Sequence, residues 1–203
     1  MKQVFTLLFA LVLFSCNSTN NTENKQNQTA LTTKKKTEQL PEFDFENFKI
    51  RNGQLGSIKI GMTINQAEMQ FNGLRRKMDE AINFGFGGGS PAYLYYSGDE
   101  LVFGLIPKLE TDTILYIIAA HKELKSTNGL NPKSTVEELL VKYPEMTIQQ
   151  DLMNDWEVFQ DPTNRWKFIF MIEKETEIGE YPKLEMPSKP KRLTTKADCI
   201  VIR

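Results

Sequence analysis

The side chains best suited to nucleophilic or metal chemistry are scarce in this sequence of 203 residues. It contains one histidine, His121, and two cysteines, Cys16 and Cys199. A cysteine nucleophile needs a neighbouring base, so catalysis of that kind requires His121 and Cys199 to converge in the fold. A zinc site built from several histidines is excluded by the count. Because Cys199 alternates with Ala197 and Val201, we expect it to be a small buried residue of a strand.

Carboxylates are more frequent, and four of them lie close together in the stretch DLMNDWEVFQD. They are Asp151, Asp155, Glu157 and Asp161. Paired carboxylates can serve acid–base catalysis or bind calcium. Their spacing does not match an EF-hand loop, however, and polar residues that alternate with Trp156 are typical of the solvent face of a strand. We therefore predict no catalytic residue, no metal and no cofactor.

The stretch INFGFGGGSPAYLYY, residues 82–96, contains glycines in a pattern close to a phosphate-binding loop. A dinucleotide loop needs G-x-G-x-x-G between a strand and a helix, so that backbone amides at the helix start face the pyrophosphate. Here Ser90 takes the place of the third glycine, Pro91 follows, and the next residues favour a strand. We expect a mobile connection into a strand. Phe86 is then a candidate contact for a protein partner, because aromatic residues are enriched at interfaces.

The N-terminal stretch MKQVFTLLFALVLFSC has the features of an export signal. Lys2 precedes an eleven-residue apolar run, Val4–Phe14, which is too short to span a bilayer. The residues Leu-Phe-Ser-Cys at 13–16 resemble the lipobox of bacterial lipoproteins. This resemblance implies a signal peptide at residues 1–15, cleavage before Cys16, and a membrane anchor of fatty acyl chains such as palmitate on Cys16. Asn17 after the cysteine favours the outer membrane, by analogy with other lipoproteins.

Residues 16–42 combine the predicted lipidated cysteine with a polar stretch rich in Asn, Gln, Thr and Lys. Such a composition cannot bury enough apolar surface to offset the entropy of ordering, so we expect a flexible tether. The charges of the chain are nearly balanced, with 25 Lys and Arg against 26 Asp and Glu. This balance does not favour nucleic-acid binding, which requires a clustered basic surface.

Two short stretches 72 residues apart, GMTINQAEMQFN and KSTVEELLVKYP, share a helix-start pattern. In each, a threonine (Thr63 or Thr135) is followed three residues later by Gln or Glu, which predicts a capping box. Both place apolar side chains on one helical face. The first helix is expected to end at Asn72 and the second at Pro144. Two unrelated capped helices would also explain the similarity, but a duplication is the interpretation we adopt.

Strand patterns follow each of these helices. Aromatic and β-branched residues predict strands at 93–96, 101–106 and 114–120 after the first, with His121 at the end of the third. They also predict strands at 157–159 and 165–172 after the second, and a final strand at 198–202. We therefore predict an α+β fold of two repeats, residues 43–127 and residues 128–203, in which a short helix packs on an antiparallel sheet.

The segment Leu55–Phe71, with Gly61, Met62, Thr63 and Gln66, resembles the helix entry of BamE-type outer-membrane lipoproteins. It is also similar to the repeats of the beta-lactamase inhibitor protein. The first resemblance implies a scaffold or accessory subunit of an envelope complex, and the second implies an inhibitor of an envelope hydrolase. For an inhibitor, Asp99 in the turn YSGDE is the contact residue to test.

Residues 173–196 form a long segment with three prolines between two predicted strands. Connections of this length are uncommon within compact domains and are often functional or disordered. Tyr181, Leu184 and Met186 are candidate contacts for a partner, and a solvated excursion is the alternative. Taken together, the sequence predicts a lipid-anchored, non-catalytic envelope protein that binds another envelope protein.

Overall fold

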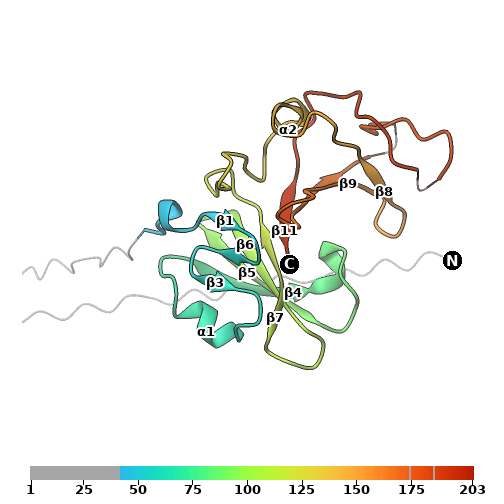
Figure 1. The fold of residues 1–203 in the computed structure, drawn as a ribbon. Helices are drawn as coiled ribbons and strands as arrows, with labels where there is room; N and C mark the ends of the chain where they lie inside the picture. The colour runs from blue at the N-terminus through green and yellow to red at the C-terminus, as the bar shows by residue number, and fades with distance from the viewer. Residues whose placement is uncertain (1–41, 174, 185) are drawn as a thin grey trace, which may run out of the picture. The chain divides into compact units, whose positions relative to one another are not determined.

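The computed structural model describes residues 42–173, 175–184 and 186–203. The predicted signal peptide, Cys16 and all of the predicted tether except its last residue lie outside these ranges. The described residues form mainly β-structure, arranged in an eight-stranded and a three-stranded antiparallel sheet (Figure 1). The order of the large sheet is β4-β5-β6-β7-β11-β10-β9-β8, and that of the small sheet is β1-β2-β3.

The elements have the following bounds. The small sheet contains β1 (Ile50–Arg51), β2 (Gln54–Leu55) and β3 (Ile58–Lys59). The large sheet contains β4 (Arg75–Glu80), β5 (Pro91–Ser97), β6 (Glu100–Pro107), β7 (Ile114–Ala119), β8 (Gln149–Asp151), β9 (Trp156–Gln160), β10 (Lys167–Met171) and β11 (Cys199–Ile202). The helices are α1 (Ile64–Glu68), α2 (Val136–Lys142) and the short 3-10 helices η1 (Phe45–Asn47) and η2 (Ala81–Phe84).

The strands expected from aromatic and β-branched runs are present as β5, β6, β7, β9, β10 and β11. β5 and β6 form a hairpin whose turn contains Gly98 with a φ of +58°, a conformation that glycine adopts at low cost. β4 was not predicted. Its sequence RRKMDE has no apolar alternation, and all six residues are exposed at the edge of the sheet. Charged side chains on an edge strand oppose pairing with other chains.

The predicted fold of two repeats, each with a helix on its own sheet, is wrong. β11 pairs with β7 through Val201 and Ile118, and with β10 through Ile200 and Phe168. Strands from both halves of the chain therefore belong to one continuous sheet. The α-helices are also minor elements, with five residues in α1 and seven in α2. Their shortness leaves most of the sheet to be covered by loops and the small sheet.

Both predicted capping boxes are confirmed. The Thr63 hydroxyl accepts a hydrogen bond from the Gln66 amide at 3.1 Å, and the Gln66 side chain accepts one from the Thr63 amide at 3.0 Å. Thr135 and Glu138 form the same pair of bonds at 3.2 and 3.0 Å. α2 ends before Pro144 as expected, whereas α1 ends at Glu68, before the predicted Asn72. The local pattern thus determined where each helix starts.

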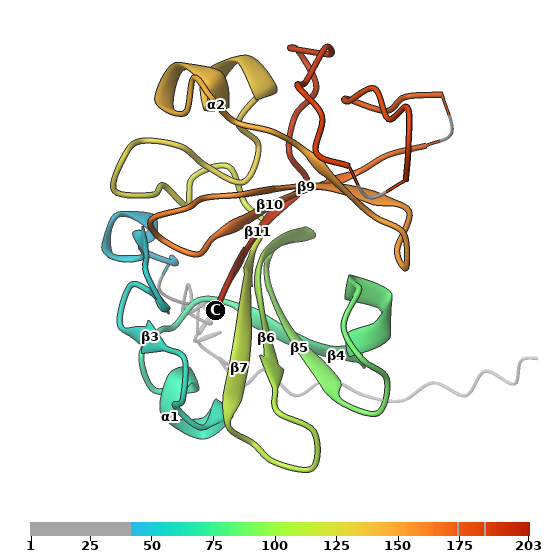
Figure 2. The same ribbon diagram turned by 45° about the vertical axis from the view of Figure 1, so that its right-hand side comes forward.

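The large sheet separates two clusters of buried apolar side chains. We call the face that packs against α1, α2 and the small sheet the outer face, and its core includes Trp166, Phe168 and Phe170. The inner face carries a smaller cluster with Leu94, Ile118 and other residues, against which η2 packs. Figure 2 shows the strong twist of the sheet, with α1 and α2 away from η2. Most of the core therefore lies on the outer face.

In the part of the chain that the structure describes, none of the helices has the length and apolar character needed to cross a membrane.

Candidate functional site

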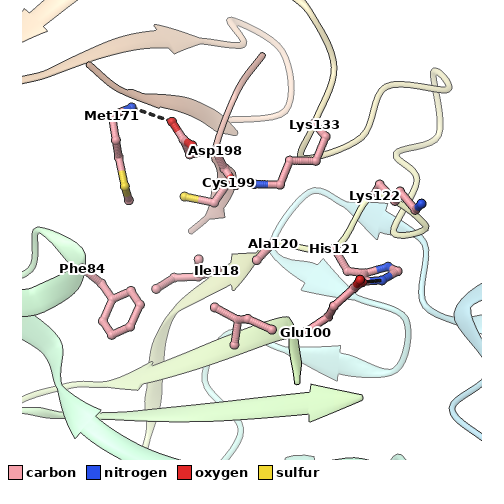
Figure 3. Close-up of a pocket in the computed structure, with 11 residues that line it drawn as sticks. Phe84, Glu100, Ile118, Ala120, His121, Lys122, Lys133, Met171, Asp198 and Cys199 are labelled. Atoms are coloured by element: carbon pink, nitrogen blue, oxygen red, sulfur yellow. Dashed lines mark hydrogen bonds and ion pairs between the residues drawn. The ribbon is translucent and has the colours of Figure 1, made fainter. Parts of the chain in front are cut away.

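A cavity of about 500 Å³ opens at the inner face of the large sheet, between η2 and the ends of several central strands (Figure 3). This volume lies within the range of small-molecule sites, roughly 300–1,000 Å³. Its walls combine apolar side chains with a few charged groups. The residues that line it are Phe84, Glu100, Leu101, Ile118, Ala120, His121, Lys122, Lys133, Met171, Asp198 and Cys199.

His121 and Cys199 both line this cavity, so the fold does bring the histidine and a cysteine to one place. Both ring nitrogens of His121 are already engaged. Nδ1 accepts a hydrogen bond from the Glu123 amide at 3.2 Å, which assigns the proton to Nε2, and Nε2 lies 2.8 Å from a carboxylate oxygen of Glu100. The ring also stacks on Phe45 at 4.6 Å. His121 is therefore held in place as a structural group.

Cys199 is buried in β11, as the sequence predicted. Burial raises the pKa of its thiol to about 12, so that the thiol stays protonated at neutral pH. In Figure 3 the sulfur points into the cavity, while His121 lies beside Glu100 on the other side. A reactive cysteine needs a thiolate and a free base, and this arrangement supplies neither.

Lys133 and Asp198 define one side of the mouth of the cavity. The Lys133 ammonium donates a hydrogen bond to the backbone oxygen of Asp198 at 2.6 Å. The Asp198 carboxylate accepts one from the Met171 amide at 2.7 Å. Both side chains are therefore held near the thiol of Cys199 by contacts with the backbone.

The acidic stretch lies only partly on a solvent face: Asp155 is exposed as expected, whereas the expectation was wrong for Glu157 and Asp161. Glu157 is fully buried on the outer face. Its carboxylate accepts hydrogen bonds from the amides of Ile178 and Gly179, at 2.5 and 2.8 Å, and from the Tyr181 hydroxyl at 2.5 Å. A buried carboxylate is tolerated where several donors satisfy it. Glu157 thereby fixes the proline-containing segment, residues 173–196, to β9.

Asp161 is buried in a second polar cluster. Its carboxylate accepts hydrogen bonds from the amides of Thr163 and Asn164, at 2.7 and 2.8 Å, and from the Tyr143 hydroxyl. Burial opposes the charged form, but these bonds outweigh it and hold the pKa of Asp161 below its ordinary value. Among the described residues, no group of three or more His, Cys, Asp or Glu side chains is arranged to hold a metal.

The predicted partner contacts occupy different environments. Phe86 packs against Tyr116 on the inner face, with 4.7 Å between ring centroids, and Tyr181 is partly buried on Glu157. Asp99 lies at the exposed tip of the β5–β6 turn, 3.7 Å from Arg75. Only two of the five candidates are exposed apolar side chains. They are Leu184 and Met186, with exposed fractions of 71% and 47%.

The glycine-rich stretch begins with a close contact across the inner face. Gly85 follows η2 with a φ of +74°, and a Cβ atom at this position would lie 2.4 Å from the Trp156 ring of β9. The chain then enters the predicted strand, β5, which begins at Pro91, two residues before the expected start at Tyr93. Gly85 therefore serves packing and a change of direction, whereas a Cβ atom at Gly87 would meet no atom within 4 Å.

Comparisons with known proteins identify a structural neighbour. No family model matches the chain, and none of the curated proteins matches it significantly. The crystal structure of the uncharacterized protein yfeY from Escherichia coli is similar, with a TM-score of 0.54 and 15% sequence identity. The match covers 76% of this chain and 99% of that chain. At this identity the similarity concerns the fold alone.

Proposed function

We propose that this chain is a non-catalytic, lipid-anchored protein of the bacterial cell envelope that binds a protein partner through residues 173–196. The observation that carries the proposal is the combination of an anchored backbone with exposed apolar side chains. Ile178 is fully buried, while Leu184 and Met186, six and eight residues later, are exposed. Loops that a rigid scaffold holds in place often carry binding residues.

The anchoring of this segment is extensive. Besides the contacts of Glu157, Ser188 exchanges two backbone hydrogen bonds with Ile148, at 2.8 and 2.9 Å. Farther along, the Val136 amide at the start of α2 donates to the Thr195 oxygen at 2.9 Å. A segment that is already ordered loses less conformational entropy when a partner binds. The same contacts disfavour the alternative of a solvated excursion.

The location of the protein in the envelope rests on the sequence. Acylation of Cys16 would anchor the chain in a membrane, and the analogy at Asn17 favours the outer membrane. The polar residues up to position 42 would separate the folded part from the lipid surface. The folded part would then reach a partner within an envelope complex while the chain stays attached to the membrane.

The experiment is in-cell crosslinking of the full-length lipidated protein, followed by purification and mass spectrometry. Deleting residues 173–196 would be a poor test, because it would leave the buried Glu157 carboxylate without its donors. The variant to use is Leu184→Ser with Met186→Ser, which changes two exposed side chains and leaves the donors to Glu157 in place. Its matched control is Met69→Ser with Val141→Ser, at positions with exposed fractions of 76% and 73%.

We expect an envelope protein to crosslink to the original chain and to the control variant. The amount of this protein recovered with the Leu184/Met186 variant should be at least tenfold lower. Equal recovery with all three proteins would remove these residues from the interface. Capture of a soluble hydrolase, with loss of its activity, would instead favour an inhibitor. A Cys16→Ser variant should appear in the soluble fraction, and its retention in the membrane would contradict the lipid anchor.

A further inference from the structure

We propose that the cavity on the inner face binds an amphipathic anion, an aliphatic chain whose anionic head group contacts the ammonium of Lys133. This is a second binding site, separate from the exposed side chains of residues 173–196. The proposal rests on apolar walls next to a lysine that is held at the mouth without a carboxylate partner.

The walls favour an aliphatic ligand. Five of the lining side chains are large apolar groups or the neutral thiol, and they come from η2 and four different strands or strand ends. They are Phe84, Leu101, Ile118, Met171 and Cys199. Small-molecule sites typically combine such predominantly apolar walls with a few placed polar groups. Because the Cys199 thiol is protonated, it adds no charge that would oppose an apolar chain.

The mouth favours an anionic head group. Lys133 uses one of its three N–H donors on the Asp198 backbone oxygen, which leaves two donors for a ligand. In Figure 3 the Lys133 ammonium lies beside Cys199, at the edge of the apolar walls. Within the described residues, no carboxylate lies within ion-pair distance of this ammonium. A carboxylate or phosphate there would form charge-assisted hydrogen bonds.

The two acidic side chains at the cavity each have one partner. Glu100 pairs with His121, and Asp198 accepts the hydrogen bond of the Met171 amide. An anionic head group meets an ammonium without an ion-pair partner among the described residues, whereas a cationic head group would be repelled by that same ammonium. Lys122 also lines the cavity, but its nitrogen points away from the walls in Figure 3. Lys133 is therefore the residue that selects the head group.

The test is a titration of the full-length chain with decanoate, below its micelle concentration. Binding would be followed by NMR of the Met171 and Ile118 methyl groups and by calorimetry. We expect both methyl signals to shift, and Lys133→Gln to weaken the affinity about tenfold, the loss typical of one charge-assisted contact. Lys142→Gln, a change at an exposed lysine of α2, is the matched control and should bind like the original chain.

Three further measurements keep the proposal falsifiable. Ala120→Leu, which adds side-chain volume at the cavity wall, should weaken decanoate binding while methyl signals of the outer face stay unchanged. Decyltrimethylammonium, with the same chain and the opposite charge, should bind at least tenfold more weakly. Tighter binding of decyl phosphate than of decanoate would support the proposal and identify the head group as a phosphate.

The proposal would be overturned by any of three results. The first is the absence of methyl shifts with both decanoate and decyl phosphate. The second is equal affinity of Lys133→Gln and the original chain. The third is equal or tighter binding of the cationic probe. Loss of decanoate binding with unchanged crosslinking through Leu184 and Met186 would separate this site from the proposed protein interface.

Discussion

The outer and inner faces of the eight-stranded sheet are covered in different ways. On the outer face, two helices, a small sheet and residues 173–196 bury a large core, and the carboxylate of Glu157 is enclosed with three donors. The inner face carries a smaller cluster and a cavity of about 500 Å³. The difference indicates that the outer face supplies most of the stability, while the inner face leaves room for a ligand.

The largest effect should follow from removing the buried carboxylate of the outer face. Glu157→Leu would leave the amides of Ile178 and Gly179 and the Tyr181 hydroxyl without an acceptor. An unsatisfied buried donor costs about 1–3 kcal/mol, so we expect the free energy of unfolding to fall by about 4 kcal/mol. Urea unfolding measures this change.

The control for this prediction is Glu123→Leu, because Glu123 is exposed. We expect its free energy of unfolding to change by less than about 0.5 kcal/mol. If the Glu157 and Glu123 variants were equally stable, the buried carboxylate would not anchor residues 173–196.

The next largest losses of stability are expected for two neighbouring isoleucines of β7, whose side chains point to opposite faces of the sheet. Ile117 is buried in the outer cluster, and Ile118 lines the cavity on the inner face. Ile117→Ala should lower the free energy of unfolding by about 4 kcal/mol and Ile118→Ala by about 2 kcal/mol. The loss is smaller for Ile118 because a side chain beside a cavity has fewer packing partners to lose.

Urea unfolding of the two variants side by side gives this difference directly. A larger loss for Ile118→Ala than for Ile117→Ala would contradict the assignment of most stability to the outer face.

A smaller effect is expected from two glycines near the inner face. Gly85→Ala would place a Cβ atom 2.4 Å from the Trp156 ring at a φ of +74°, and should cost about 2 kcal/mol. Gly87→Ala is the matched change, since a Cβ atom there meets no atom within 4 Å. Thermal unfolding should show a lower Tm only for Gly85→Ala. Equal Tm values would mean that the contact between Gly85 and β9 does not form.

The smallest effect is a pH dependence that comes from Asp161. Its pKa in the folded chain lies below its ordinary value of 3.8, so folding favours the carboxylate. The stability contributed by this group is present above about pH 4 and is lost as the pH falls below that value. In acid unfolding experiments, Asp161→Asn should therefore show a shallower loss of stability below pH 4. If stability fell with pH as steeply in Asp161→Asn as in the original chain, Asp161 would not contribute to the pH dependence.

The features that were predicted correctly from the sequence depend on residues that lie close together in the chain. The capping boxes at Thr63 and Thr135 form within four residues, and the hairpin of β5 and β6 follows from its apolar pattern and turn. Continuity of the sheet through β7 and β11 could not be predicted, because these strands lie far apart in the chain and their patterns do not specify partners. An apolar strand of either half would satisfy the same pattern.

The burial of Glu157 was missed for a related reason. Its donors Ile178 and Gly179 lie 21 and 22 residues later, in a segment without a strand or helix pattern. A charged residue that alternates with apolar neighbours predicts a solvent face unless a distant segment covers it. The cavity likewise needs strands from both halves of the chain, whereas the buried state of Cys199 followed from local alternation alone.

Hydrogen exchange of the full-length chain tests most directly whether residues 173–196 present Leu184 and Met186 from a fixed backbone. We predict that the Ile178 and Gly179 amides, which donate to Glu157, are protected as strongly as the amides of β9. In Glu157→Leu this protection should fall sharply. Exchange of both amides at the rate of an unstructured peptide would contradict the proposed binding segment, because residues 173–196 would then have no anchored backbone.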